Sequence, residues 1–102
     1  MAMIYVSHCY GGKAENLKRA SEITHNLQIK DTDNCYICPL LAFSHLGYNE
    51  IGYDEEIALC LDLMTVCDKL IVASELSEGV KREIDLAEKC KMEIEYLEDT
   101  EQ

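Results

Sequence analysis

The chain has 102 residues, 48% hydrophobic and 28% charged, which fits one globular domain and is too short for two independent cores. Its formal net charge is −11, from 20 acidic and 9 basic side chains, so its surface repels nucleic-acid backbones and anionic lipid. A small anionic ligand is still compatible with this charge, because helix N-termini and glycine amides bind phosphate locally. These properties favour a small-molecule partner over a nucleic-acid polymer or a membrane.

The sequence carries no sign of export or membrane insertion. No apolar run approaches the roughly 20 residues that span a bilayer, and the first residues lack the basic segment and long apolar stretch of a signal peptide. We therefore expect a cytoplasmic protein whose six cysteines are reduced thiols. One domain should occupy residues 1–102, with residues 98–102 forming a frayed acidic tail.

The first half of the chain predicts two strands and a helix. Met3–Val6 is a β-rich run followed by the glycine-containing loop Ser7–Gly12. Apolar residues then recur at helical spacing, at Ala14, Leu17, Ala20, Ile23 and Leu27. Cys35–Cys38 is expected to form a second strand that stops at Pro39, and a short helical turn and a polar loop follow up to Tyr53.

The second half predicts two helices, each followed by a strand. Asp54 is expected to cap the first helix, whose apolar face would hold Ile57, Leu59, Leu63 and Val66. Leu70–Ala73 is continuously apolar, as expected of a central parallel strand. Ser77 opens the last helix, which should bury Val80, Ile84 and Ala87, and the partly polar Met92–Leu97 is expected to be an edge strand.

Alternating strands and helices predict an α/β fold, a three-layer flavodoxin/Rossmann-like domain with a short parallel sheet of about four strands. Ligands bind such sheets at the carboxyl ends of the strands, near the point where the strand order reverses. The loops Ser7–Gly12 and Ser74–Gly79 should meet there.

The first of these loops offers Ser7, His8, Gly11 and Gly12 as a phosphate-binding turn. Glycines let the backbone approach a ligand, and the amides of the following helix attract an anion. The segment matches neither a dinucleotide-binding fingerprint nor a P-loop. An ordinary tight turn, with His8 as a bystander, is the alternative.

The second loop opens the last helix with Ser77 and Gly79, and Glu83 follows about one and a half turns later. Ser77 suits either an N-cap or a phosphate contact. Glu83, next to an inward-facing residue, suits a nucleophile or base at a pocket floor, or else a surface partner of Lys81 or Arg82. Tyr5, in the middle of the first strand, suits core packing.

Cys35-x-x-Cys38 invites a metal or redox interpretation, but a structural zinc site needs four ligands and no second pair is present. A strand would also point the two thiols to opposite faces. We expect buried thiols here and at Cys9, Cys60, Cys67 and Cys90, and no metal or cofactor.

Three stretches of the chain form a recognisable set: Ile4-Tyr5-Val6 with Gly11-Gly12, the turn and strand Asp68–Ala73, and Ser77-x-Gly79-x-x-x-Glu83. Together they resemble the nucleoside 2-deoxyribosyltransferase-like superfamily, which includes 2′-deoxynucleoside 5′-phosphate N-hydrolases, and in particular a small uncharacterised phage and bacterial branch. The third is the most specific, and the resemblance extends from Ile4 to about Leu97.

The resemblance implies a role for each matching residue. Glu83 would attack the anomeric carbon of the sugar and form a covalent intermediate. Tyr5 would align Glu83, and a serine at position 77 implies contact with a 5′-phosphate rather than a free 5′-hydroxyl. The resemblance therefore predicts an N-glycosidase, hydrolase or transferase, that acts on nucleoside 5′-monophosphates and needs no cofactor.

One position departs from the family pattern. The family's second acid lies eight residues before the aspartate that corresponds to Asp68, and that position is Cys60 here; Asp62 lies on another helix face. The alternative function is therefore a catalytically weak or inactive protein that binds or sequesters nucleotides. The resemblance also predicts a homodimer or higher homo-oligomer, with contacts along 54–67.

Overall fold

The computed structural model describes residues 1–97. The acidic tail that we expect over residues 98–102 lies outside the described residues. In chain order the elements are β1 (Met3–Ser7), α1 (Ala14–Lys30), β2 (Cys35–Ile37), α2 (Pro39–Ala42), α3 (Tyr53–Met64), β3 (Lys69–Val72), α4 (Glu78–Lys89) and β4 (Glu93–Tyr96).

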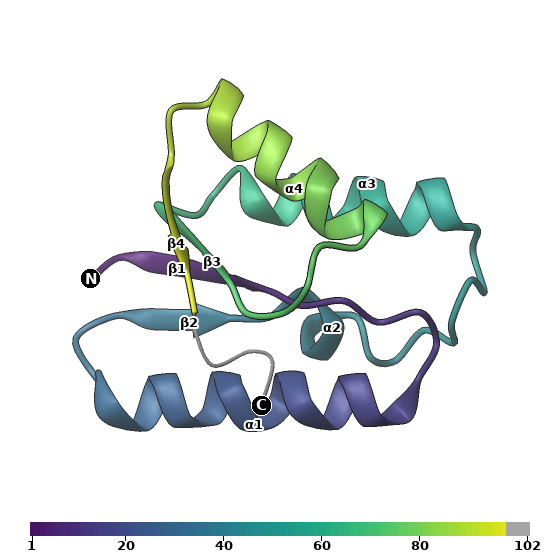
Figure 1. Ribbon diagram of the computed structural model, residues 1–102, viewed down its shortest axis with the longest axis horizontal. Coiled ribbons are helices and arrows are strands. Elements are labelled where there is room, and N and C mark those ends of the chain that lie inside the picture. Colours follow the sequence, from purple (N-terminus) through teal and green to yellow (C-terminus); the bar gives the residue numbers. More distant parts are fainter. Residues whose placement is uncertain (98–102) are drawn as a thin grey trace.

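The four strands form one parallel sheet in the order β2-β1-β3-β4. Tyr5 of β1 stands opposite Ile37 of β2 and Leu70 of β3. Helix α1 covers one face of the sheet, and α3 and α4 cover the other (Figure 1). The predicted three-layer α/β fold is confirmed. The strand order reverses between β1 and β3, so the loops that follow these two strands open on the same edge of the sheet.

The alternation of side chains along β1 divides the core between the two faces. Val6 packs toward α1, in a cluster with Ala20, Cys38 and Ala73. Tyr5 packs on the opposite face, in a cluster with buried residues of α3, β3 and α4 that include Met64, Leu70, Val72, Val80, Ile84 and Ala87. Since Ser7 lies two residues after Tyr5, it shares the face that α4 covers.

Two sequence predictions about α3 are wrong. The helix begins at Tyr53 with Gly52 at the N-cap, where φ is 105°, so Asp54 lies in the first turn and does not cap it. Val66 is 62% exposed, because the helix ends at Met64 and Val66 lies beyond it. Met64 is the residue of α3 that is fully buried in the core.

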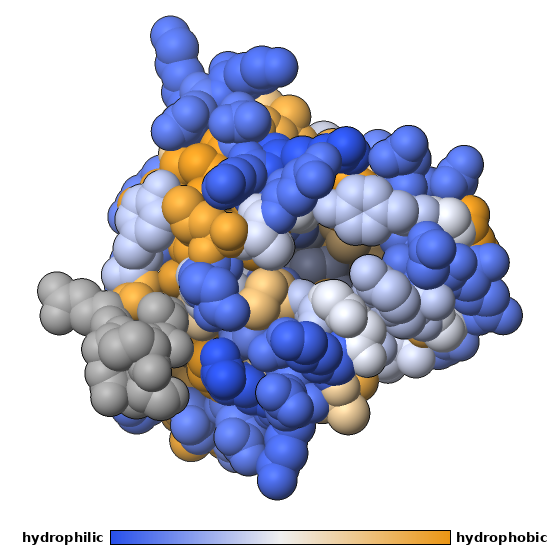
Figure 2. All heavy atoms as spheres, turned by 45° about the vertical axis from the view of Figure 1, so that its right-hand side comes forward, coloured by the Kyte–Doolittle hydropathy of each residue, from blue (hydrophilic) through white to orange (hydrophobic). Residues whose placement is uncertain are grey.

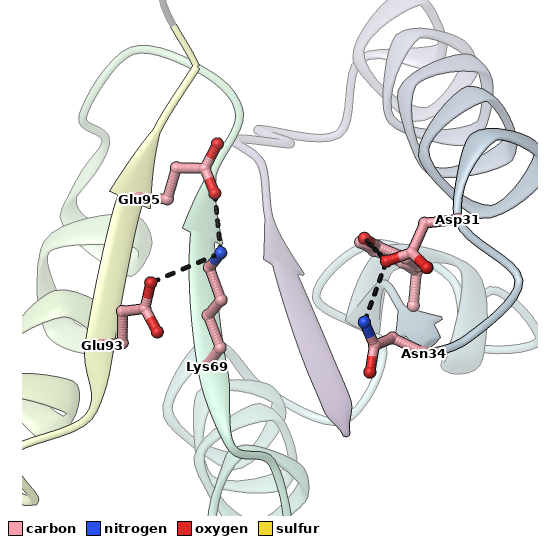
Figure 3. A network of polar contacts seen from close by, with 6 residues as sticks. Asp31, Asn34, Lys69, Glu93 and Glu95 are labelled. Carbon is pink, nitrogen blue, oxygen red and sulfur yellow. Dashed lines mark hydrogen bonds and ion pairs between the residues drawn. The ribbon is translucent and has the colours of Figure 1, made fainter. Parts of the chain in front are cut away.

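The edge position predicted for the last strand is confirmed, since β4 pairs with β3 at the end of the strand order. Lys69 of β3 forms ion pairs with Glu95 at 2.8 Å and Glu93 at 3.5 Å (Figure 3). A separate polar group joins α1 to β2, where Asn34 and Tyr36 both donate to Asp31. Over residues 1–97, no helix has the length and apolar character needed to cross a membrane.

Candidate functional site: a buried carboxylate in a cleft

A cleft of about 250 Å³ lies at the carboxyl ends of β1 and β3. It is bounded by the loop after β1, the segment around Pro39, one side of α3 and the first turns of α4. Figure 2 shows a hollow of this kind among side chains of intermediate hydropathy. The residues that line it include His8, Tyr10, Gly11, Tyr48, Tyr53, Glu56, Ile57, Cys60, Ser77, Glu78, Gly79 and Glu83.

Glu83 is the centre of this site. It is only 5% exposed and is the one acidic side chain that is buried among residues 1–97. Tyr5 Oη donates a hydrogen bond to Glu83 Oε2, and Ser7 Oγ donates one to Glu83 Oε1. Glu83 is therefore not a surface partner of Lys81 or Arg82, and Arg82 pairs instead with Asp54 and Glu78.

Two opposing effects act on the pKa of Glu83. Burial raises the pKa above its usual value, because the charged form loses its hydration, while the hydroxyls of Ser7 and Tyr5 lower it by donating to the carboxylate. Burial also raises the pKa of Tyr5, and the neighbouring charge of Glu83 adds to that rise. Tyr5 consequently stays protonated and remains a donor. It packs in the core, as its place in the strand predicted, and its hydroxyl has Glu83 as its partner.

The N-terminus of α4 contributes the polar end of the cleft. Ser77 is its N-cap, as predicted, and Ser77 Oγ accepts a hydrogen bond from the Val80 amide at 3.3 Å. A Cβ on Gly79 would lie 3.2 Å from Cδ1 of Ile57, so glycine lets α4 approach α3 closely here. The first-turn amides of a helix have no intrahelical acceptor, which makes this end suitable for an anion.

The loop after β1 contributes His8, which is 5% exposed. Its Nδ1 lies 2.7 Å from the Cys9 carbonyl oxygen, and since a carbonyl only accepts, Nδ1 carries the proton. Burial lowers the pKa of His8, so the ring is neutral and Nε2 is an acceptor. Within the described part of the chain, this buried Nε2 has no hydrogen-bond partner.

The four phosphate-binding candidates of this loop occupy different places. His8 and Gly11 line the cleft. Ser7 does not line it, and its hydroxyl is engaged with Glu83. Gly12 also lies outside the lining, with φ of +75° and with the Tyr48 ring 3.0 Å from where a Cβ would stand.

Sequence reasoning missed the aromatic rim of the cleft. Tyr10 and Tyr48 meet edge to face with ring centroids 5.5 Å apart. The Tyr53 ring lies 5.6 Å from the guanidinium carbon of Arg82, which ties the rim to α4. Tyr48 and Tyr53 each follow a glycine in an otherwise polar loop. This clustering of large rings is the sequence feature that could have indicated an aromatic rim.

One face of α3 was also missed. Tyr53, Glu56, Ile57 and Cys60 line the cleft, and Met64 continues the same face into the core. The thiol of Cys60 has its pKa raised to about 12, first by burial and then by the charge of Glu83. If tyrosine and cysteine are counted as apolar, the helical spacing of Tyr53, Ile57, Cys60 and Met64 predicts this face of α3.

The described residues give no support for a metal centre. Over residues 1–97 no group of three or more His, Cys, Asp or Glu side chains could hold a metal ion. The six cysteines in that range are free thiols, and Cys35 and Cys38 are no exception. The expectation of burial is wrong for Cys90, which is exposed because it follows the last residue of α4, and Cys35 and Cys60 are only half-buried.

The fold and the site together define a parallel-sheet α/β domain with a ligand-sized cleft and a buried carboxylate at the carboxyl edge of its sheet. Residues 2–97 match a family described as a domain of unknown function (DUF7768), and the chain belongs to that family. No curated protein and no solved structure matches the chain.

Proposed function

We propose that the protein is an N-glycosidase that acts on nucleoside 5′-monophosphates, with Glu83 as the nucleophile. The observation that carries this proposal is the state of Glu83: a buried carboxylate, facing a cleft, whose two oxygens are each held by a hydroxyl of β1. Burying a charge is costly, and a carboxylate kept in such a place is a candidate for chemistry.

The hydrogen bonds to Glu83 leave it able to react. Each carboxylate oxygen has about two lone pairs, and each accepts one of the two hydrogen bonds, so a lone pair remains for attack. The donors come from positions two residues apart on one rigid central strand, Tyr5 and Ser7. They orient the carboxylate and favour its charged form, which is the nucleophilic one.

The cleft has separate features for the phosphate and the base of a nucleotide. The N-terminus of α4, with Ser77 and Gly79, suits a phosphate. The unpartnered Nε2 of His8, which is an acceptor, suits a hydroxyl of the ligand. The rings of Tyr10, Tyr48 and Tyr53 offer aromatic surface on which a planar base stacks.

The reaction would proceed in two displacements. A Glu83 oxygen forms a bond to C1′ as the C1′–N bond breaks, and the bonding electrons leave with the base. Water then attacks C1′, loses a proton and releases Glu83 as a carboxylate. The products are the free base and the sugar 5-phosphate; a second base in place of water would make the reaction a transfer.

The test is chromatography of free bases after long incubation with each nucleoside 5′-monophosphate, in both the ribo and the deoxy series. Wild type is compared with Glu83→Gln, which keeps the shape of the side chain, and with Glu88→Gln on the exposed side of the same helix. Release that disappears only in Glu83→Gln supports the proposal. Release that persists in Glu83→Gln contradicts it.

A second candidate function is binding without chemistry, which is favoured by the neutral thiol of Cys60 on the α3 side of the cleft. Without an acid to protonate it, the base would depart slowly, since general acid catalysis contributes about 10²–10⁴ in rate. A nucleotide that raises the melting temperature while no base is released would support binding, by ligand stabilisation of the folded state.

A further inference from the structure

We propose that Glu56 is the general acid that protonates the departing base. This inference rests on the proposed N-glycosidase function and names a second catalytic residue for the same site. It follows from the position of Glu56 in the cleft, and it removes the difficulty posed by Cys60.

Glu56 is the carboxyl group available on the α3 side of the cleft. Three glutamates line the cleft: Glu56, Glu78 and Glu83. Glu83 is held by Tyr5 and Ser7 as the nucleophile, and Glu78 is exposed and paired with Arg82 at 3.3 Å. Glu56 is half-buried, and within residues 1–97 it forms neither an ion pair nor a side-chain hydrogen bond.

Glu56 also lies where the base would sit. A smaller hollow of about 70 Å³ adjoins the main cleft and shares Tyr10, Tyr48, Glu56 and Cys60 with it. Its other walls are largely apolar and include Leu17, Phe43, Leu46 and Leu59. The main cleft holds Glu83 and the α4 N-terminus, so sugar and phosphate belong there and the base belongs beside Glu56.

Glu56 and Cys60 occupy the same face of α3, four residues apart. At 1.5 Å rise per residue this spacing places Glu56 about 6 Å further toward the start of the helix. Burial raises the pKa of the Cys60 thiol to about 12, so this thiol is a poor proton donor, and Glu56 is the carboxyl group that α3 presents to the cleft. A donor at this place beside the base suits a proton acceptor on the base ring, such as N7 of a purine.

The proton balance of the two displacements is then complete. In the first step Glu83 bonds to C1′, the C1′–N electron pair moves to the base, and the base takes the proton of the Glu56 carboxylic acid and leaves neutral. In the second step water attacks C1′, the Glu56 carboxylate takes the proton of that water, and the C1′–O bond to Glu83 breaks. Both glutamates return to their starting states.

The experiment measures base release by wild type, Glu56→Gln and the matched control Glu55→Gln, which removes an exposed charge from the adjacent position of α3. The probes are the deoxynucleoside 5′-monophosphates and 7-methyl-2′-deoxyguanosine 5′-monophosphate, whose base already carries a positive charge and leaves without a proton. Glu56→Gln should slow release from the ordinary nucleotides about 10²–10⁴-fold. It should leave release from the methylated one within a few-fold of wild type.

A loss of equal size on both kinds of substrate would overturn the assignment, because it would indicate a structural or binding role. Glu83-dependent release that is unchanged in Glu56→Gln would overturn it as well, while leaving the proposed function intact. No release by wild type from any nucleotide would refute both. As a second variant, Cys60→Asp in the Glu56→Gln background should restore much of the lost rate if proton donation from α3 is what Glu56 supplies.

Discussion

The two ends of the parallel sheet use their polar side chains differently. At the carboxyl end, Glu83 is buried beside a cleft of about 250 Å³ and is held by side-chain hydroxyls. At the amino end a larger hollow, about 320 Å³, is lined by residues such as Met64, Cys67, Asp68, Leu86 and Met92. Asp68 there is exposed, and its Oδ2 accepts a hydrogen bond from the Met3 amide at 2.8 Å.

The two hollows differ in what their polar side chains bond to. At the amino end, polar side chains bond to the backbone: Asp68 binds Met3, and Asn34 Oδ1 accepts from the Ala2 amide at 2.9 Å. These hydrogen bonds hold the start of β1 in place, and their desolvation cost is small because the groups stay partly hydrated. At the carboxyl end, the fold tolerates a carboxylate whose pKa burial raises, and such a cost is typical of a functional group.

The largest effect we expect separates the two ends by activity. Replacing a carboxylate by its amide at the carboxyl end, Glu83→Gln, should reduce base release by about 10³-fold or more, because the nucleophile is lost. The same replacement at the amino end, Asp68→Asn, should leave the rate within about two-fold. The measurement is the initial rate of base release at saturating nucleotide, and equal losses in the two variants would break the comparison.

The next effect concerns the hydroxyl that orients Glu83. Tyr5→Phe removes a hydrogen bond to a charged group, worth about 1.5–3 kcal/mol, so kcat should fall about 10- to 100-fold. Because the hydroxyl lowers the pKa of Glu83, its removal should move the acid limb of the pH–rate profile to higher pH. The matched control is Tyr36→Phe, which loses a hydrogen bond to Asp31 away from the cleft.

The acid limb can be assigned to Glu83 because of its neighbours. Tyr5 and Ser7 face it from β1, and the charge of Glu83 reaches Cys60 on α3 and Cys38 after β2. Burial raises the pKa of both thiols, so they stay neutral where Glu83 titrates. An acid limb that is identical in Tyr5→Phe and wild type would show that another group controls it.

A smaller effect should appear in stability: Glu83→Gln, which lowers activity, should raise the free energy of unfolding at about pH 7. The folded-state pKa of Glu83 lies above its usual 4.5, so the contribution of this one group to the free energy of unfolding is most favourable below about pH 4.5 and falls as the pH rises through the folded-state pKa. Glu83→Gln removes this loss of stability, because an amide does not ionise. At about pH 7 it should be more stable than wild type, by about 1.4 kcal/mol for each unit of pKa shift.

Urea denaturation at about pH 7 and about pH 4.5 checks this expectation. The advantage of Glu83→Gln should shrink at the lower pH, where wild-type Glu83 is protonated as well. Glu88→Gln, on the exposed side of α4, should show no such pH dependence. A Glu83→Gln variant that is less stable than wild type at both pH values would mean that the burial of this carboxylate costs nothing.

Sequence patterns predicted the fold because its signals are local. Continuous apolar strands, the apolar spacing of Ala20, Ile23 and Leu27, and the N-cap at Ser77 each depend on neighbouring residues. The edge position of β4 followed from its polarity. The errors at Asp54 and Val66 both arose at helix ends. An aspartate suits the N-cap and the first turn equally, and an apolar residue does not indicate where a helix stops.

The candidate site was predicted less completely because it depends on distant contacts. A strand residue and a helix residue 78 positions apart, Tyr5 and Glu83, become partners only through the placement of α4 over β1. The local pattern of α4 allowed Glu83 to be a surface residue, and the resemblance was needed to single it out. Local spacing could have marked the α3 face that carries Glu56 and the clustered tyrosines, but only the folded chain brings them to the same cleft as Glu83.

The smallest effect we expect lies at the start of β3, where Lys69 pairs with Glu93 and Glu95 of the edge strand (Figure 3). The hydrogen bond to Glu95 is the first cause that raises the pKa of Lys69, so the pairing stabilises the fold below the usual value of 10.5 and is lost above the raised one. The glutamate side chains are 72% and 49% exposed, and exposed pairs contribute about 1 kcal/mol at most.

Lys69→Met should therefore lower the free energy of unfolding by no more than about 1 kcal/mol, measured by urea denaturation at low salt. The difference should narrow at about 1 M salt, where the Debye length is about 3 Å, and base release should not change. A large loss of activity in Lys69→Met would instead show that the edge strand takes part in shaping the cleft, and the two ends of the sheet would no longer be separable.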